Sequence, residues 1–116
     1  MTHVSIIHNP RCSKSRQTLS LLEEHNCEIQ VVEYLKSPLK SGEIEGLLVK
    51  LGLTAREIMR TKETEYKEQN LADPSLSEAQ LIEAIVKTPK LLERPIVLAN
   101  DKAAIGRPPE NVLAIL

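Results

Sequence analysis

The chain has 116 residues, of which 41% are hydrophobic and 27% charged, proportions that suit one globular domain over residues 1–116. Its formal net charge is −1 and it contains no Phe or Trp, so it lacks both the basic field and the stacking platforms that nucleic-acid binding uses. No apolar run approaches the roughly 20 residues that a membrane-spanning helix needs. We therefore expect neither a nucleic acid nor a membrane among its partners.

The cysteine and histidine content bears on compartment and metal binding. Two cysteines, Cys12 and Cys27, are too few for a disulfide framework, and no signal-peptide hydrophobic region precedes the first apolar run. Both observations predict a cytoplasmic location, where a lone reactive thiol stays reduced. The histidines have no ligand spacing with each other or with the cysteines, so we expect no metal site.

The first third of the chain reads as strand, helix and strand. Residues 4–8 form a short apolar run typical of a buried strand, a helix is expected over 13–25, and a second strand over 29–34. Elements at this spacing form a βαβ unit, whose two strands are parallel and joined by a right-handed crossover.

The middle of the chain is predicted to be helical. Ser41 is placed to cap a helix that ends at Gly52, and two pairs have capping-box spacing, Thr54 with Glu57 and Ser77 with Gln80. We expect helices over 41–51, from Thr54 toward Arg60, and from Ser77 to just before Pro89. The polar segment 61–73 is expected to be irregular or a short helix.

The last third predicts a hairpin over 96–99 and 103–106, followed by a helix from Pro109 to the end. The whole order is β-α-β, a helical insert, then β-β-α. That order indicates an α/β thioredoxin-like fold, with a mixed sheet flanked by helices. Such domains carry a cis proline before the third strand, facing the active cysteine. Pro95 occupies that place, so the analogy predicts a cis Arg94–Pro95 bond.

Cys12 follows the turn after the first strand and precedes the first helix. Arg11, Lys14 and Arg16 lie within four residues of it. A helix N-terminus and nearby cations both favour a thiolate, and the same features hold anionic substrates. A buried structural cysteine is the alternative, but these polar neighbours favour a reactive one. His8 either orients and ionises this thiol or is an ordinary histidine at the end of a strand.

Ser15 stands where a Cys-x-x-Cys oxidoreductase carries its second thiol. Cys27 cannot replace it, because a helix of about 10 residues, or roughly 15 Å, separates it from Cys12, whereas a disulfide needs Cα atoms within about 7 Å. We expect Cys27 to be a small apolar residue entering the second strand. The thiol that regenerates Cys12 then comes from outside the chain. The spacing from Cys12 to Arg16 is also too short for a tyrosine-phosphatase loop.

Three arginines remote from Cys12 in sequence are candidate anion ligands: Arg60, Arg94 and Arg107. Each alone reads as a surface charge. In a thioredoxin-like arrangement, however, the loop at Pro95 faces the cysteine, and guanidinium forks bind tetrahedral oxyanions in a bidentate manner. Three converging arginines make an oxyanion pocket above a thiolate.

The sequence resembles the glutaredoxin-dependent arsenate reductase (ArsC) family over nearly its whole length, and within that family the YfgD-type branch. The matching stretches are His8-Asn9-Pro10-Arg11-Cys12-Ser13-Lys14-Ser15-Arg16, Arg60, Glu93-Arg94-Pro95-Ile96-Val97 and Gly106-Arg107-Pro108-Pro109-Glu110. The resemblance implies a thioredoxin-like fold with a helical insert, and the reduction of arsenate to arsenite in arsenic detoxification.

The resemblance also implies roles for particular residues. Cys12 is then the nucleophile that attacks arsenate, and Arg60, Arg94 and Arg107 bind the arsenate oxygens. The supporting residues are His8, Arg11, Ser15, Arg16 and Pro95. No bound cofactor is implied; glutathione is a co-substrate that attacks the Cys12 adduct, and glutaredoxin reduces the resulting mixed disulfide.

Two other functions remain open at this point. Spx-type regulators share the scaffold and bind RNA polymerase, although Ser15 removes the dithiol switch that they use. A monothiol-glutaredoxin-like thiol exchanger is the third possibility, in which Arg11, Lys14 and Arg94 bind the carboxylates of glutathione.

Overall fold

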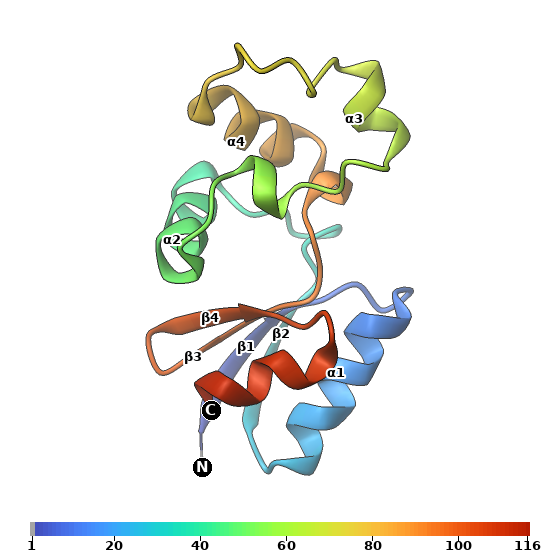
Figure 1. Ribbon diagram of the computed structural model, residues 1–116. Helices are drawn as coiled ribbons and strands as arrows, with labels where there is room; N and C mark the ends of the chain where they lie inside the picture. The colour runs from blue at the N-terminus through green and yellow to red at the C-terminus, as the bar shows by residue number, and fades with distance from the viewer. Residues whose placement is uncertain (1) are drawn as a thin grey trace. The chain divides into compact units, whose positions relative to one another are not determined.

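The computed structural model describes residues 2–116 and divides the chain into two compact units (Figure 1). The first unit runs to Ser37 and resumes at Arg94–Leu116, and the second is Pro38–Glu93. The elements of the first unit are β1 (His3–Ile7), α1 (Ser13–Glu24), β2 (Glu28–Val32), β3 (Ile96–Ala99), β4 (Lys102–Ile105) and the 3-10 helix η3 (Pro109–Ile115). Among residues 2–116, no helix has the length and apolar character that crossing a bilayer requires.

The first unit contains a four-stranded mixed sheet in the order β2-β1-β3-β4. β1 is parallel to β2 and antiparallel to β3, and β3 is antiparallel to β4. This confirms the predicted α/β fold class, in which the helical segment between β2 and β3 is an insert. The expected strands agree with the observed ones to within two residues at each end.

One face of the sheet is covered by α1 and η3 (Figure 1). Because side chains alternate along a strand, Val4 and Ile6 of β1 point to the same face as their partners Ala99 and Val97 of β3. The buried cluster on this face is aliphatic throughout and comprises Val4, Ile6, Leu22, Val97, Ala99, Val112 and Ile115. Cys27 packs against its margin, partly buried, as expected for a small apolar residue.

Two X-Pro bonds are cis: Arg94–Pro95, which the fold analogy predicts, and Arg107–Pro108, which nothing in the sequence indicates. The hairpin turn at Asn100 and Asp101 has φ angles of +52° and +62°, the left-handed values that two-residue hairpin turns favour. The last segment differs from the α-helix we expect. It is a 3-10 helix, with hydrogen bonds such as the one from Asn111 N–H to Pro108 O.

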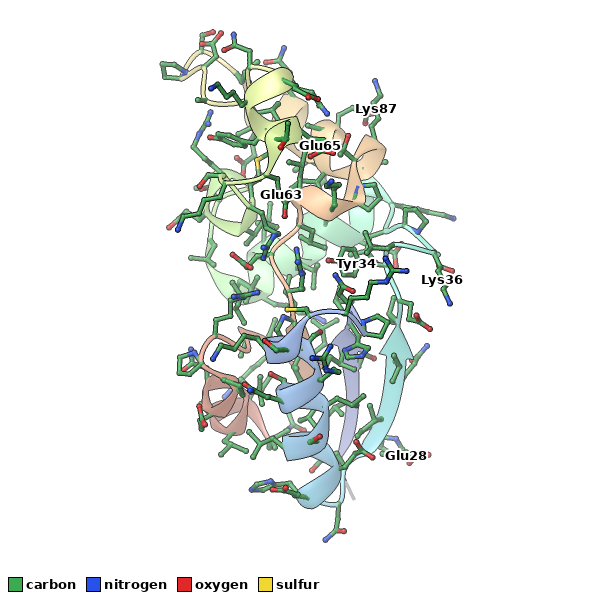
Figure 2. All side chains as sticks on the ribbon, turned by 90° about the vertical axis from the view of Figure 1, so that its right-hand side faces the viewer. Glu28, Tyr34, Lys36, Glu63, Glu65 and Lys87 are labelled. Atoms are coloured by element: carbon green, nitrogen blue, oxygen red, sulfur yellow. The ribbon has the colours of Figure 1, made fainter. Side chains whose placement is uncertain are left out.

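Just after β2, a buried side chain is followed by exposed ones. Tyr34 has only 1% of its surface exposed, whereas Lys36 points outward and pairs with Glu33 at 3.6 Å (Figure 2).

The second unit is helical, with α2 (Ser41–Leu51), η1 (Arg56–Ile58), α3 (Thr64–Glu68), α4 (Glu78–Lys87) and η2 (Pro89–Leu91). Its core is again aliphatic apart from Tyr66, and α2 packs against α4. Its largest fully buried side chains are Ile44, Ile58, Ile85, Leu91 and Leu92.

The helix ends of this unit test the capping predictions. The capping box of Ser77 and Gln80 is confirmed, and Gly52 ends α2 with a φ of +68°. The predicted cap of α2 is wrong by one residue, because Lys40 is the N-cap and its N–H donates to the Glu43 carboxylate. Thr54 does donate to Glu57, but a single 3-10 turn follows in place of a helix.

Arg56 organises the polar segment that the sequence leaves undefined. Its guanidinium donates to Tyr66 Oη at 2.8 Å and to the backbone carbonyls of Leu71 and Asp73. These bonds satisfy carbonyl groups that no regular element pairs, and they fix the chain around α3.

Gly106 marks a close approach between α1 and the start of β3. The Cβ that any other residue adds here lies 2.6 Å from Thr18 Oγ1 and 2.8 Å from Pro95 Cγ, both shorter than packed atoms tolerate. Thr18 is fully buried and its hydroxyl donates to Lys14 O, so it has little room to move.

We therefore expect Gly106→Ala to lower the free energy of unfolding by about 1–3 kcal/mol, the usual cost of overpacking. Urea denaturation followed by circular dichroism measures the change. Gly46→Ala is the matched control: it lies inside α2 with no atom near the added Cβ, so it is expected to raise stability by about 0.5–1 kcal/mol. Equal stability of Gly106→Ala and the unmodified protein contradicts the close approach.

Candidate active site

Cys12 is the N-cap residue of α1, at the point where the chain turns from β1 into the helix. The turn is closed by hydrogen bonds from Cys12 N–H to Asn9 O and from Arg11 N–H to the Asn9 side chain, each 3.0 Å. Arg16 N–H donates to Cys12 O and begins the helical pattern. The sulfur therefore lies at the positive end of the helix dipole.

Ser15 holds this loop in place by hydrogen bonds. Its side chain is fully buried, and its Oγ accepts the Asn9 N–H at 3.0 Å and bonds His8 Nδ1 at 2.9 Å. Arg16 adds a second fastening, since its Nη1 donates to Pro10 O at 2.9 Å. Ser15 thus takes the place of a second thiol with a group that orders the loop and has no redox chemistry.

His8 is 5% exposed and hydrogen-bonds Ser15, so it touches the loop beneath Cys12. Burial lowers the pKa of His8, with Arg16 adding to the effect and Glu33 opposing it. A lowered pKa keeps the imidazole neutral over more of the range around neutral pH. Its connection to Cys12 therefore runs through Ser15.

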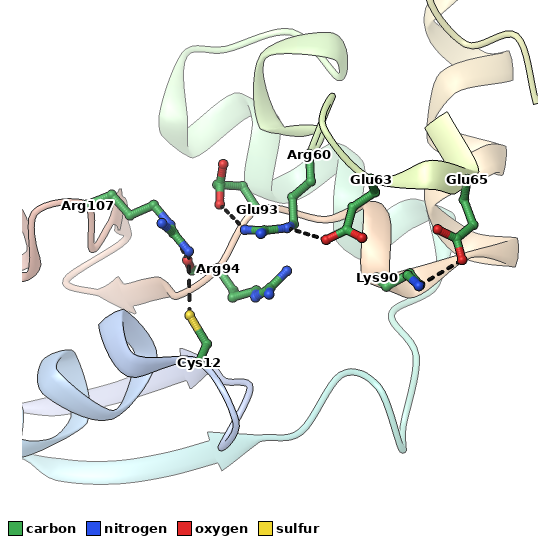
Figure 3. A network of polar contacts seen from close by, with 8 residues as sticks. All are labelled: Cys12, Arg60, Glu63, Glu65, Lys90, Glu93, Arg94 and Arg107. Carbon is green, nitrogen blue, oxygen red and sulfur yellow. Dashed lines mark hydrogen bonds and ion pairs between the residues drawn. The ribbon is translucent and has the colours of Figure 1, made fainter. Parts of the chain in front are cut away.

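Two arginines of the first unit act on the sulfur. Arg107 Nη2 lies 3.5 Å from Cys12 Sγ (Figure 3), and the guanidinium of Arg94 lowers the pKa of the thiol. Arg107 is itself positioned by Arg94, because its Nε donates to the Arg94 backbone carbonyl at 2.8 Å. Arg94 directly precedes Pro95, so the predicted proline loop carries Arg94, and the Arg94 carbonyl on that loop positions Arg107.

The pKa of the Cys12 thiol is lowered from its ordinary value. Burial acts in the opposite direction, because it disfavours the charged form. The backbone N–H groups of Ser15 and Lys14 and the guanidinium of Arg94 outweigh that penalty. The two N–H groups belong to the first turn of α1, and Arg94 is far from Cys12 in the sequence. The site can therefore present a thiolate nucleophile beside two positively charged forks.

Arg60, the third predicted arginine, belongs to the second unit and is bound by two carboxylates. Its Nε lies 3.0 Å from Glu63 Oε1 and its Nη1 lies 3.0 Å from Glu93 Oε1 (Figure 3). Burial would lower the pKa of Arg60, but the two glutamates raise it above its usual value. Its role as an oxyanion ligand stays a prediction.

Sequence reasoning missed both glutamates. Glu63 follows Arg60 by three residues, a spacing that could have been noticed, whereas Glu93 is 33 residues away and only the fold brings it near. Of the other predicted residues, Arg11 has an exposed side chain, and its backbone N–H closes the turn before Cys12. Within residues 2–116, no three His, Cys, Asp or Glu side chains gather into a possible metal site.

Residues 7–115 match the ArsC family, and the chain therefore belongs to that family, with its thioredoxin-like fold. It is 60% identical to the protein of Escherichia coli K12 called uncharacterized protein YfgD, over 97% of this chain and 96% of the relative. It is 53% identical to an arsenate reductase of Neisseria meningitidis serogroup A, over 100% of both chains. A solved structure of an arsenate reductase from Vibrio cholerae superposes with a TM-score of 0.97 at 50% identity, over 99% of this chain and 98% of the other.

Because Arg94 stabilises the thiolate, Arg94→Met is expected to raise the pKa of Cys12 toward that of an ordinary thiol. The measurement is the rate of alkylation by iodoacetamide as a function of pH, carried out on Cys27→Ala protein so that one thiol reacts. Reactivity is present above the pKa and falls as the pH drops through it, so the variant's curve shifts to higher pH. Arg11→Met is the control and is expected to leave the curve in place. Identical curves for Arg94→Met and the parent protein contradict the assignment.

Proposed function

We propose that this protein is a thiol-dependent reductase that converts arsenate to arsenite, using glutathione and glutaredoxin as external reductants. The observation that carries the proposal is the Cys12 sulfur at the N-terminus of α1, 3.5 Å from Arg107 Nη2, with a pKa that the helix N-terminus and Arg94 lower. Arsenate reductases among its relatives, at 53% and 50% identity, support the choice of oxyanion. The reduced thiol that the reaction needs fits a cytosolic setting.

The first step is attack of the Cys12 thiolate on arsenic(V). A sulfur–arsenic bond forms, and one arsenate oxygen takes up protons and leaves as water. Arg94 and Arg107 bind the remaining oxygens and stabilise the negative charge that develops on them. Arg60 is proposed as a further oxyanion ligand on the basis of family resemblance. The result is a covalent adduct in which arsenic is still pentavalent.

The second step needs a thiol that the chain does not supply, since Ser15 occupies the position of a resolving cysteine. Glutathione attacks the Cys12 sulfur, and the electron pair of the sulfur–arsenic bond passes to arsenic, which leaves as arsenite. Arsenic gains two electrons, and Cys12 and glutathione each lose one in forming a mixed disulfide. A glutaredoxin thiolate then takes the glutathione sulfur by thiol–disulfide exchange and releases Cys12 as a thiolate.

Purified protein with glutathione, glutaredoxin, glutathione reductase and NADPH is expected to oxidise NADPH only when arsenate is present. Cys12→Ser should abolish this turnover because it removes the nucleophile. Arg107→Met should lower kcat by about 10²–10³-fold, as the loss of one oxyanion-stabilising donor does in other enzymes. The coupled absorbance assay measures all three.

Cys27→Ala serves as the control and should keep full activity, because that residue only packs at the margin of the core. No arsenate-dependent NADPH oxidation by the unmodified protein would overturn the substrate assignment. Glutathionylation of Cys12 that proceeds at the same rate with and without arsenate would instead indicate a thiol exchanger.

A further inference from the structure

A cleft of about 260 Å³ lies beside the loop that leads to Cys12. One wall is that loop, residues 8–11, and the other is the segment after β2, with Glu33, Leu35 and Lys36. The whole cleft belongs to the first unit. Residue 11 directly precedes the cysteine, and consecutive Cα atoms are about 3.8 Å apart, so one wall of the cleft ends next to the reacting residue.

Main-chain hydrogen bonds fix both walls of the cleft. His8 N–H donates to Val32 O at 2.8 Å, which joins the loop to the end of β2. The N–H groups of Lys36 and Ser37 donate to Glu33 O at 2.9 and 3.0 Å and close a turn after β2. A ligand that enters therefore meets walls that are already ordered, and this lowers the entropy cost of binding.

The lining of the cleft carries two positive charges and one negative charge. Arg11 and Lys36 have exposed side chains and contribute the positive charges, and Glu33 contributes the negative one. Lys36 Nζ lies 3.6 Å from Glu33 Oε1, a long contact between side chains that are 77% and 39% exposed. An exposed ion pair of this kind contributes little to stability, so a charged ligand can replace it at small cost.

Apolar side chains complete the lining. Leu35 is 46% exposed and lines the cleft together with Pro10, which is also exposed. Covering such a surface with hydrocarbon is favourable because it removes apolar area from water. An inorganic oxyanion has no hydrocarbon to offer, and the Glu33 carboxylate repels it. The cleft therefore suits an organic ion that carries charges of both signs on a hydrocarbon chain.

We propose that this cleft binds glutathione and holds its thiol ready to attack the Cys12 adduct. The proposal rests on the proposed function, in which glutathione supplies the thiol that the chain lacks. Glutathione has two carboxylates, one ammonium group and methylene groups between them. Arg11 and Lys36 bind the carboxylates, and Glu33 accepts hydrogen bonds from the ammonium group. The methylene groups lie against Leu35.

The size of glutathione fits the position of the cleft. An extended chain of three residues spans about 10 Å, and the residue that carries the thiol is the middle one. A glutathione whose carboxylate is held at Arg11 therefore brings its sulfur to Cys12, the next residue along the protein chain. Such binding replaces a random encounter of two thiols by the reaction of two groups that are already positioned.

Isothermal titration calorimetry with S-methylglutathione tests the site, because the methyl group prevents disulfide formation and leaves the charges unchanged. Unmodified protein is expected to bind this probe at millimolar concentration or below. Arg11→Met and Lys36→Met should each weaken binding about 10-fold, since each removes a charged donor from a carboxylate. Glu33→Gln should weaken it as well, because an amide oxygen carries no charge to attract the ammonium group.

Lys102→Met is the matched control. Lys102 is exposed like Lys36, but it lies in β4, at the opposite edge of the sheet from β2. Its replacement removes the same charge and should leave the affinity for the probe unchanged. The dimethyl ester of the probe, in which both carboxylates are blocked, should bind equally weakly to unmodified protein and to Arg11→Met.

The coupled arsenate assay gives a second readout. Arg11→Met and Lys36→Met should each raise the KM for glutathione about 10-fold and leave the KM for arsenate in place, because they remove binding of one substrate alone. A general loss of structure would change both constants together.

Unmodified protein that does not bind S-methylglutathione at millimolar concentration overturns the proposal, as does an affinity that all three cleft variants leave unchanged. A KM for glutaredoxin that rises while the KM for glutathione stays constant assigns the cleft to the protein reductant and also overturns it. The binding measurement needs no arsenate. Weakened binding in the variants without arsenate turnover therefore means that the reductase assignment fails and the glutathione site remains, whereas turnover with unchanged probe affinity means that the cleft proposal fails alone.

Discussion

The site depends on holding a negative charge on a sulfur that is partly buried. Burial of Cys12 works against ionisation, and backbone N–H groups of α1 together with Arg94 outweigh it. Two of them, the N–H groups of Lys14 and Ser15, are unpaired for a general reason: the first turn of any helix leaves its amide donors without partners. Because Cys12 is the N-cap of α1, its sulfur lies near those donors, and they lower the pKa of its thiol.

This arrangement makes the loop before α1 as important as the residues that face the substrate. The Ser15 hydroxyl, the Arg16 guanidinium and the Asn9 side chain hold the loop by hydrogen bonds that never reach the sulfur. They fix the turn that places Cys12 at the N-terminus of α1. The pKa of the thiol therefore depends also on residues that act only by holding the loop.

The sequence alone was enough for the order of elements, the mixed sheet and the cis bond before Pro95. The elements rest on local patterns, such as an apolar strand, a turn and a capped helix, which a short stretch of chain contains in full, and the cis bond rests on the fold that their order indicates. Capping was predicted correctly where the N-cap side chain itself accepts, as at Ser77. It was misplaced at α2, where the N-cap is a lysine whose only part in the capping box is its backbone N–H.

What the sequence could not provide were contacts that depend on long-range folding. Glu93 meets Arg60 because an antiparallel bridge joins Met59 to Leu92. Arg56 reaches the carbonyls of Leu71 and Asp73 only once the segment around α3 has closed on it. Neither pairing has a spacing that a periodic pattern reveals, and for this reason both glutamates beside Arg60 escaped notice.

Arg107 is oriented by the backbone carbonyl of Arg94, and the Arg94 side chain takes no part in that bond. The two guanidinium groups that act on Cys12 are therefore independent in a useful sense. Any residue at position 94 offers the same backbone carbonyl. The side chain there can therefore change during evolution while the Arg107 guanidinium keeps its orientation. A homologue can in this way carry a different side chain in place of Arg94 while Arg107 stays oriented toward the cysteine.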